Sequence, residues 1–268
     1  MVPILFSLGS VPIPSHAVFV GLGTIVAIVL GWRRAREHEF AKPELLWIIA
    51  GGLFGGALAS RYGMVFRYMY ESPMPTLDGF AAYGGRTLLG GLAGAYAGVV
   101  LTKRVLGIQR RVGDALVPGL ALGIAIGRVG CFLSEKPGTP TTVPWGVTLS
   151  AEDVRRIPGC ADCVPGVSLH PSFLYESLFL AILALPLFLI TAWRRPLASW
   201  MVEGDLFKLF LLVYAVFRFG VEFVRGNPEM HLGLSGSQLF VIPAVIGFVV
   251  YFTARSSSGA RRARSEIR

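Results

Sequence analysis

Seven long hydrophobic stretches alternate with shorter polar segments along the chain. Each stretch has about 20 residues and few charges, which is what an α-helix needs to cross the hydrocarbon layer of a bilayer. The predicted spans cover approximately residues 15–32, 44–66, 84–101, 112–133, 170–193, 205–223 and 236–253. This pattern predicts an all-α, polytopic membrane protein whose seven transmembrane helices form a single domain over residues 1–253.

Lysine and arginine are distributed unevenly between the connections. The loops after the first, third and fifth spans, together with the C-terminal tail, hold fifteen of them, whereas the N-terminal segment and the other loops hold five. Because basic residues concentrate on the cytoplasmic side, the N-terminus is predicted outside and the C-terminus in the cytoplasm. The longest loop, about 134–169, is then extracytoplasmic, and its prolines are expected to break any helix. The basic tail, 254–268, is predicted to be disordered and to lie against anionic lipid head groups.

The composition agrees with a membrane protein, since 53% of the 268 residues are hydrophobic and only 15% are charged. The net charge of +9 would suggest nucleic-acid binding in a soluble protein. Here the basic residues flank the spans, and no platform of alternating aromatic and basic residues is apparent. We therefore predict membrane lipids, and no nucleic acid, as partners. The first span is followed, not preceded, by Arg33, Arg34 and Arg36, which indicates an uncleaved helix rather than a signal peptide.

Glycines recur at about four-residue spacing in the second, third and fourth spans. Ridges of small residues let helix backbones approach closely in lipid, so we expect these three spans to form a compact core. The glycines are Gly51, Gly52, Gly55 and Gly56; Gly90, Gly94 and Gly98; and Gly119, Gly123 and Gly127.

Four arginines, Arg61, Arg86, Arg128 and Arg218, fall inside the predicted spans. An arginine at the bilayer centre costs roughly 2.5–3.5 kcal/mol on insertion scales, so such residues usually serve a function. The predicted topology brings all four toward the outer side of the membrane. Planar guanidinium groups gathered at one depth favour a site for a phosphate or a carboxylate.

The sixth span carries a polar stripe of Tyr214, Arg218, Glu222 and Arg225. Steps of four, four and three residues place these side chains on one helix face. In one interpretation, Arg218 and Glu222 only neutralise each other as an i,i+4 pair. In the other, the stripe also recognises phosphate; this is favoured because Arg128 and Arg61 lack obvious partners.

Further polar residues mark the outer ends of other spans. His16 opens the first span and Gln238 the seventh. The segment His170-Pro171-Ser172 is typical of a helix start, because proline is tolerated at the first helical position. Tyr175 and Glu176 follow one turn later. His170 is either a structural hydrogen-bonding group or a catalyst.

Three cysteines are too few for a disulfide framework. Cys160 and Cys163 form a C-x-x-C in the outer loop, where a metal site is not expected without companion ligands. A local disulfide and no function at all remain alternatives for this pair. Cys131 lies at the membrane edge beside Arg128, where it is either a buried free thiol or part of a site.

Four segments together resemble a known family, the prolipoprotein diacylglyceryl transferases of bacterial plasma membranes, and the resemblance spans nearly the whole chain. The segments are 127–132 (GRVGCF), 170–176 (HPSFLYE), 214–225 (YAVFRFGVEFVR) and, more weakly, 233–238 (GLSGSQ). The resemblance implies a multi-pass plasma-membrane enzyme with its active site facing the outer leaflet. It also implies transfer of diacylglyceryl from phosphatidylglycerol to the lipobox cysteine thiol of a preprolipoprotein signal peptide. Glycerol phosphate is released, and no metal or soluble cofactor takes part.

By position, Arg128 matches the family arginine that binds the phosphatidylglycerol head group. Arg218 and Glu222 match another important arginine and acid, Tyr214 matches a span-six tyrosine, and Glu135 and Gly138 match a loop glutamate and glycine. The expected catalytic residues are Arg128, Arg218, Glu222, Glu135, Tyr214 and His16. The expected substrate-binding residues are Arg128, Arg86, Arg61, His170, Tyr175, Gly138 and Arg225.

The chain departs from the family pattern at three places. The family motif G-G-x-x-x-H-G-G has Leu89 in place of its histidine, and the first-span tyrosine is His16. The motif G-N-F-x-N-G-E becomes GCFLSE over residues 130–135, which lacks both asparagines and one residue. Lipid-phosphate binding is therefore better supported than the identity of the base.

An acceptor thiol, with a pKa near 8.5, must become a thiolate to attack. His16 is the first candidate for the base, followed by Glu222 and Glu135. One alternative is a relative that binds anionic phospholipid without catalysis or modifies a different acceptor. A seven-helix receptor or transporter is disfavoured, because the seventh span has no lysine for retinal and no internal repeat is evident.

Overall fold

The computed structural model describes residues 1–62, 87–157, 163–193 and 200–266, together with the single residues 65, 68, 69, 76, 78, 160, 197 and 198. These residues group into two compact units. The first unit comprises Met1–Arg34, Val112–Pro228 and Gln238–Arg268, and the second comprises Ala35–Arg111 and Glu229–Ser237. Each unit is described by itself below, and the boundaries of a single domain over 1–253 stay a prediction.

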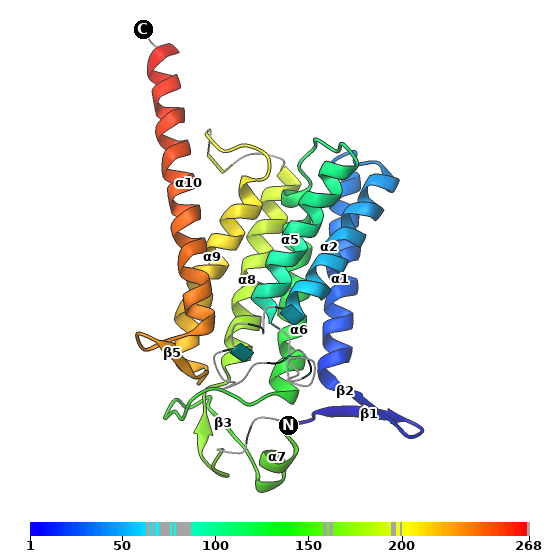
Figure 1. Ribbon diagram of the computed structural model, residues 1–268, viewed down its shortest axis with the longest axis vertical. Helices are drawn as coiled ribbons and strands as arrows, with labels where there is room; N and C mark the ends of the chain where they lie inside the picture. Colours follow the sequence, from blue (N-terminus) through cyan, green and yellow to red (C-terminus); the bar gives the residue numbers. More distant parts are fainter. Residues whose placement is uncertain are drawn as a thin grey trace. The chain divides into compact units, whose positions relative to one another are not determined.

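Each of the seven predicted spans contains a helix (Figure 1). The helices are α1 (Ser15–Glu37), α2 (Lys42–Tyr62), α5 (Leu88–Val105), α6 (Gly113–Ser134), α8 (Ser172–Trp193), α9 (Asp205–Val221) and α10 (Gly236–Glu266). Among the described residues, α1, α2, α6, α8 and α10 are long and apolar enough to cross a membrane. The chain is therefore a mostly helical, polytopic membrane protein.

Helices α5 and α9 do not belong to that set of five. The 17 residues of α9 rise only about 25 Å, which is less than the roughly 30 Å of a bilayer core. Seven crossings and the outward orientation of the N-terminus stay predictions.

In the first unit, α6 packs against α1 and α8. A Cβ atom on Gly123 would lie 2.5 Å from the carbonyl oxygen of Gly23 and 2.8 Å from the Cβ of Ala27. Only glycine permits this approach of the two backbones, so the ridge predicted in the fourth span packs α6 against α1. On the α8 side, the Ser177 hydroxyl donates to the carbonyl oxygen of Ala125 at 2.8 Å.

In the second unit, α2 and α5 pack along their glycines. A Cβ atom added to Gly55 would collide with the backbone of Gly94, and one added to Gly94 would collide with the backbone of Gly55. A Cβ atom on Gly98 would likewise collide with the backbone of Gly51. We expected the second, third and fourth spans to form one core. The described glycine contacts instead pair α2 with α5 and α6 with α1.

Three small two-stranded antiparallel sheets add to the helices in the described residues, so the fold is mostly helical rather than all-α. Strands β1 (Ile4–Leu8) and β2 (Val11–Pro14) form a hairpin that leads directly into α1. Its turn contains Gly9, which has a positive φ of 62° that glycine adopts without strain. The other pairs are β3 (Val147–Thr148) with β4 (Ser168–Leu169), and β5 (Glu229–His231) with β6 (Leu234–Ser235).

The long loop of residues 134–169 is a small packed structure. It contains α7 (Ala151–Arg156), so the expectation that its prolines break any helix is wrong. A capping box between Ser150 and Asp153 supplies the N-terminal hydrogen bonds that a short helix needs. Next to α7, Cys160 and Cys163 form a disulfide, the first of the two alternatives for this pair.

The C-terminal helix α10 continues to Glu266 and so runs through most of the segment predicted to be disordered. Because the helix is already formed when it leaves the apolar stretch, extending it requires no new nucleation. The five arginines and three alanines of the tail are also good helix formers.

Candidate functional site

The ends of three helices meet in the first unit, at the lower end of Figure 1. Backbone hydrogen bonds join the segment after α6 to the start of α8 and to the end of α9. Gly138 N–H donates to the His170 carbonyl at 2.8 Å, and Thr139 N–H donates to the Val224 carbonyl at 2.9 Å. A Cβ on Gly138 would overlap the carbonyl oxygen of Val224 and lie 3.0 Å from that of His170. Gly138 therefore allows these segments to approach closely. Because glycine has no side chain, it offers none to a ligand.

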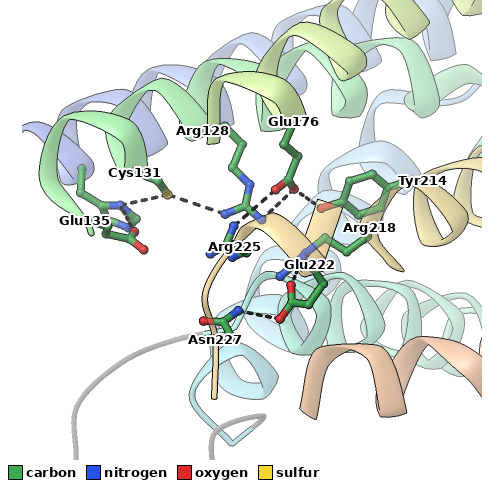
Figure 2. Close-up of polar contacts among 10 residues, drawn as sticks. Arg128, Cys131, Glu135, Glu176, Tyr214, Arg218, Glu222, Arg225 and Asn227 are labelled. Atoms are coloured by element: carbon green, nitrogen blue, oxygen red, sulfur yellow. Dashed lines mark hydrogen bonds and ion pairs between the residues drawn. The ribbon is translucent and has the colours of Figure 1, made fainter. Parts of the chain in front are cut away.

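Glu176 is the centre of the polar cluster between these helices (Figure 2). Its side chain is fully buried, and one carboxylate oxygen accepts from Arg128 Nη2 at 2.8 Å and from the Tyr214 hydroxyl. Nη1 of Arg225 lies 3.6 Å from the other oxygen. The expectation that Arg128 lacks a partner is therefore wrong, because α8 supplies this carboxylate.

Sequence reasoning noted Glu176 but did not assign it to the site. The signal was present, since Glu176 is the one charged residue within Ser172–Trp193. A single carboxylate in an otherwise apolar span needs a partner, because an unpaired charge is costly in lipid.

Arg218 and Glu222 form a second buried pair beside the first. They interact directly, and the Asn227 amide donates to the other oxygen of Glu222 at 2.6 Å. The i,i+4 pair that the spacing allowed is thus present. Figure 2 shows that Arg128, Arg218 and Arg225 approach one another instead of pointing apart.

The cluster holds three guanidinium groups and two carboxylates, which leaves one positive charge in excess when all five are ionised. Buried Arg128 Nε and both Nε and Nη1 of Arg225 make no hydrogen bond to any described residue. Burial lowers the pKa of Arg225 to about 10, and the neighbouring charges of Arg128 and Arg218 contribute, yet Arg225 stays protonated near neutral pH. Buried donors and an excess charge together suit a monovalent anion.

The ring of Phe173 forms an apolar wall beside two of these arginines. The Arg225 guanidinium carbon lies 4.3 Å from the ring centroid, and that of Arg128 lies 5.8 Å away. Such cation–π contacts hold the guanidinium groups without using their N–H donors. The donors therefore stay available for an acceptor.

His16 and Glu135 meet around Cys131, which Arg128 contacts through Nη1 while its Nη2 contacts Glu176. His16 Nδ1 lies 3.6 Å from Cys131 Sγ and 3.4 Å from a Glu135 carboxylate oxygen. Arg128 Nη1 donates to the same sulfur at 3.7 Å. The structure thus links the candidate base, His16, to the arginine cluster through Cys131.

His170 and Tyr175 form a separate hydrogen-bonded group with Trp145. The Tyr175 hydroxyl lies 3.0 Å from His170 Nδ1 and accepts from Trp145 Nε1 at 2.9 Å. This arrangement ties the loop after α6 to the start of α8.

Two of the four intramembrane arginines are not placed at the site. Arg61 belongs to α2 in the other unit, and Arg86 lies outside the described residues. The predicted convergence is therefore observed for Arg128 and Arg218 and stays a prediction for the other pair.

The helices and the buried arginine–glutamate cluster define a polytopic membrane protein with a site suited to an anion. The chain belongs to the prolipoprotein diacylglyceryl transferase family, whose family model matches residues 3–254. This confirms the resemblance inferred from the four sequence segments.

Similar curated proteins are phosphatidylglycerol–prolipoprotein diacylglyceryl transferases. The protein from Clostridium tetani is 27% identical over 260 residues, which cover 94% of this chain and 97% of the relative. Transferase 2 of Streptomyces coelicolor is 35% identical over 81% of this chain and 68% of its own length. The protein from Gloeobacter violaceus is 30% identical over 91% of this chain and 89% of its own length.

Proposed function

We propose that this protein transfers a diacylglyceryl group from phosphatidylglycerol to the lipobox cysteine thiol of preprolipoproteins, at the outer leaflet of the bacterial plasma membrane. The observation that carries the proposal is the buried excess charge of Arg128, Arg218 and Arg225 over Glu176 and Glu222. Family membership supports the reaction, because the named relatives are transferases with these two substrates.

The lipid phosphate is the group that fits the arginine cluster. The phosphodiester of phosphatidylglycerol carries one negative charge, which would balance the single positive charge in excess. Its oxygens would accept from the buried N–H groups of Arg128 and Arg225 that lack hydrogen bonds within the described residues. Arg218 stays paired with Glu222 and contributes charge to the same small volume.

The transfer step follows from this placement. The thiolate sulfur attacks the carbon of the diacylglyceryl group that is bonded to the phosphate oxygen. A carbon–sulfur bond forms while this carbon–oxygen bond breaks. The electron pair leaves with glycerol phosphate, which gains a negative charge that the arginines stabilise. The proton of the thiol must be removed, and the proposed acceptor is His16, which lies in the first turn of α1 next to Glu135.

Incubating the purified protein with phosphatidylglycerol and a lipobox peptide tests the proposal. Mass spectrometry should show one diacylglyceryl unit added to the peptide, on its cysteine. A peptide with serine at that position is the matched control and should gain nothing. An unmodified cysteine peptide, with folded protein and bound lipid, would contradict the transferase activity.

A second candidate is a relative that binds anionic phospholipid without this transfer or with another acceptor. Leu89 in place of the family histidine, and Cys131 in place of an asparagine, favour it. Lipid binding without modification of any lipobox peptide would support it. If Leu89→His then produced transfer, the missing histidine would account for the difference.

A further inference from the structure

Three side chains of types that bind zinc converge beside Arg128 of the arginine cluster. His16 comes from the first turn of α1, Cys131 from the last turn of α6, and Glu135 from the residue that ends α6. Their ligand atoms all lie within 4.8 Å of one another. His16 and Cys131 are separated by 115 residues, so the sequence did not group them.

Two of the three distances between these atoms match a tetrahedral zinc site. Zinc binds nitrogen and carboxylate oxygen at about 2.0–2.2 Å and thiolate sulfur at about 2.3 Å, so tetrahedral angles place nitrogen about 3.6 Å from sulfur and about 3.4 Å from oxygen. The observed separations are 3.6 Å for His16 Nδ1 to Cys131 Sγ and 3.4 Å for His16 Nδ1 to Glu135 Oε1. Cys131 Sγ and the Glu135 oxygen lie within 4.8 Å of each other, and a shift of the partly exposed Glu135 carboxylate would bring them to the roughly 3.6 Å of a tetrahedral zinc site.

The surroundings leave one side of the trio accessible. The His16 and Glu135 side chains are 45% and 43% exposed, whereas Cys131 is buried. Three protein ligands with an accessible fourth position are typical of catalytic zinc sites, and structural sites usually use four protein ligands.

The Arg128 guanidinium is a neighbouring cation that could oppose a metal ion. Its guanidinium is already paired with Glu176 at 2.8 Å, and it donates to Cys131 Sγ at 3.7 Å. Donors to a ligand sulfur are common in the second coordination shell and orient the ligand. The charges of the thiolate and of Glu135 together balance those of a divalent ion.

We propose that His16, Cys131 and Glu135 bind a zinc ion whose fourth position takes the acceptor thiol. With His16 bound to zinc, the ion takes the place of His16 as the group that activates the thiol: the thiol would bind as a thiolate and release its proton to water, because a coordinating thiol is deprotonated. Its sulfur then attacks the glyceryl carbon, and glycerol phosphate leaves with the electron pair as above; no oxidant or reductant is needed. The role of the acceptor thiol rests on the proposed function, whereas zinc binding by the three side chains does not. The proposal departs from the absence of a metal that the family resemblance implies.

Titration of the purified, metal-stripped protein with CoCl₂, without lipid or peptide, tests the site directly. We expect one cobalt ion per chain and an absorption band from charge transfer between thiolate and cobalt, both displaced by ZnCl₂. Cys131→Ser should abolish the band. His16→Ala and Glu135→Gln should weaken zinc binding by more than about 100-fold, because even second-shell changes cost about 10- to 100-fold.

Two matched variants control for the other histidines and sulfurs. His38→Ala removes a histidine of the other unit, and the Cys160→Ser/Cys163→Ser double variant removes the disulfide sulfurs. Both should keep the band and the zinc affinity. A band lost with the disulfide, or retained in Cys131→Ser, would overturn the proposal, and so would absence of the band in the wild type.

The same preparation separates this proposal from the proposed function. Zinc binding without any transfer would support the site and contradict the transferase activity. Transfer without zinc binding would overturn the site and leave the transferase standing. When both occur, chelation should slow transfer at least about tenfold and ZnCl₂ should restore it; a rate unchanged by chelation would overturn the role of zinc in activating the thiol.

Discussion

The two ends of α9 each hold a carboxylate surrounded by cations, and they differ in how well water reaches the cations. At the start of the helix, buried Asp205 contacts Lys208 at 2.9 Å, the Tyr251 hydroxyl at 2.6 Å and Arg255 at 3.1 Å. The Lys208 and Arg255 side chains are 24% and 34% exposed. Water therefore reaches both cations at this end, where the Asp114 carboxylate also accepts from the Gly204 and Phe207 N–H groups.

At the other end, the cluster around Glu176 and Glu222 has one positive charge in excess. Here the side chains of Arg128, Arg218 and Arg225 are only 9%, 5% and 13% exposed. The two ends therefore differ in both charge balance and contact with water. One end is a junction between α9 and α10, while the buried end has charge and donors that a bound phosphate would satisfy.

The largest expected effect comes from removing an arginine at the buried end. Arg128→Ala should slow diacylglyceryl transfer by about 100-fold or more, because losing one electrostatic donor at a reacting group typically costs about 10²–10³ in rate. Arg255→Ala, the matched change at the solvated end, should leave the rate within about threefold. Initial rates on a lipobox peptide, with thermal unfolding to verify the fold, provide the comparison. Equal rates for the two variants would contradict it.

Removing the buried carboxylate should have the next largest effect. Glu176→Gln leaves Arg128 and Arg225 without their anion, and breaking a buried pair typically costs about 3–5 kcal/mol. Asp205→Asn should cost less, about 1–2 kcal/mol, because water reaches its partners. Unfolding of both variants in one detergent, with added denaturant, measures the difference. A smaller loss for Glu176→Gln than for Asp205→Asn would show that burial is not the deciding factor.

The smallest effect is expected at an exposed ion pair. Glu152 and Arg156 in α7 form an i,i+4 pair whose side chains are 60% and 64% exposed. Glu152→Gln should change stability by no more than about 0.5 kcal/mol, because water already screens the pair. The same unfolding assay measures this change, and a loss comparable to that of Asp205→Asn would refute the ordering by exposure.

The sequence predicted the helices well because each is a long apolar run with polar ends. The stripe on α9 was also predictable, since Tyr214, Arg218 and Glu222 are one helical turn apart. By contrast, the hairpin before α1 and the short helix α7 were missed. They depend on local hydrogen bonds, such as the capping box at Ser150, which a hydrophobicity pattern does not register.

Contacts between distant segments were harder to predict. Glu176 was visible as a lone acid, but only the packing of α8 against α6 and α9 shows which arginines it serves. The meeting of His16 with Glu135 likewise depends on how α1 and α6 pack through their glycines. Sequence periodicity identifies the face of one helix, whereas the pairing of faces needs the tertiary structure.

Native mass spectrometry of the purified protein, given equal amounts of phosphatidylglycerol and diacylglycerol, tests the central claim most directly. The account predicts that the wild type and Arg255→Ala retain one phosphatidylglycerol in preference to diacylglycerol, and that Arg128→Ala loses this retention by at least about tenfold, because the charge-assisted hydrogen bonds to the phosphate are gone. Equal retention by Arg128→Ala and Arg255→Ala, or no preference for the lipid that carries phosphate, would contradict a phosphate-binding role for the buried arginines.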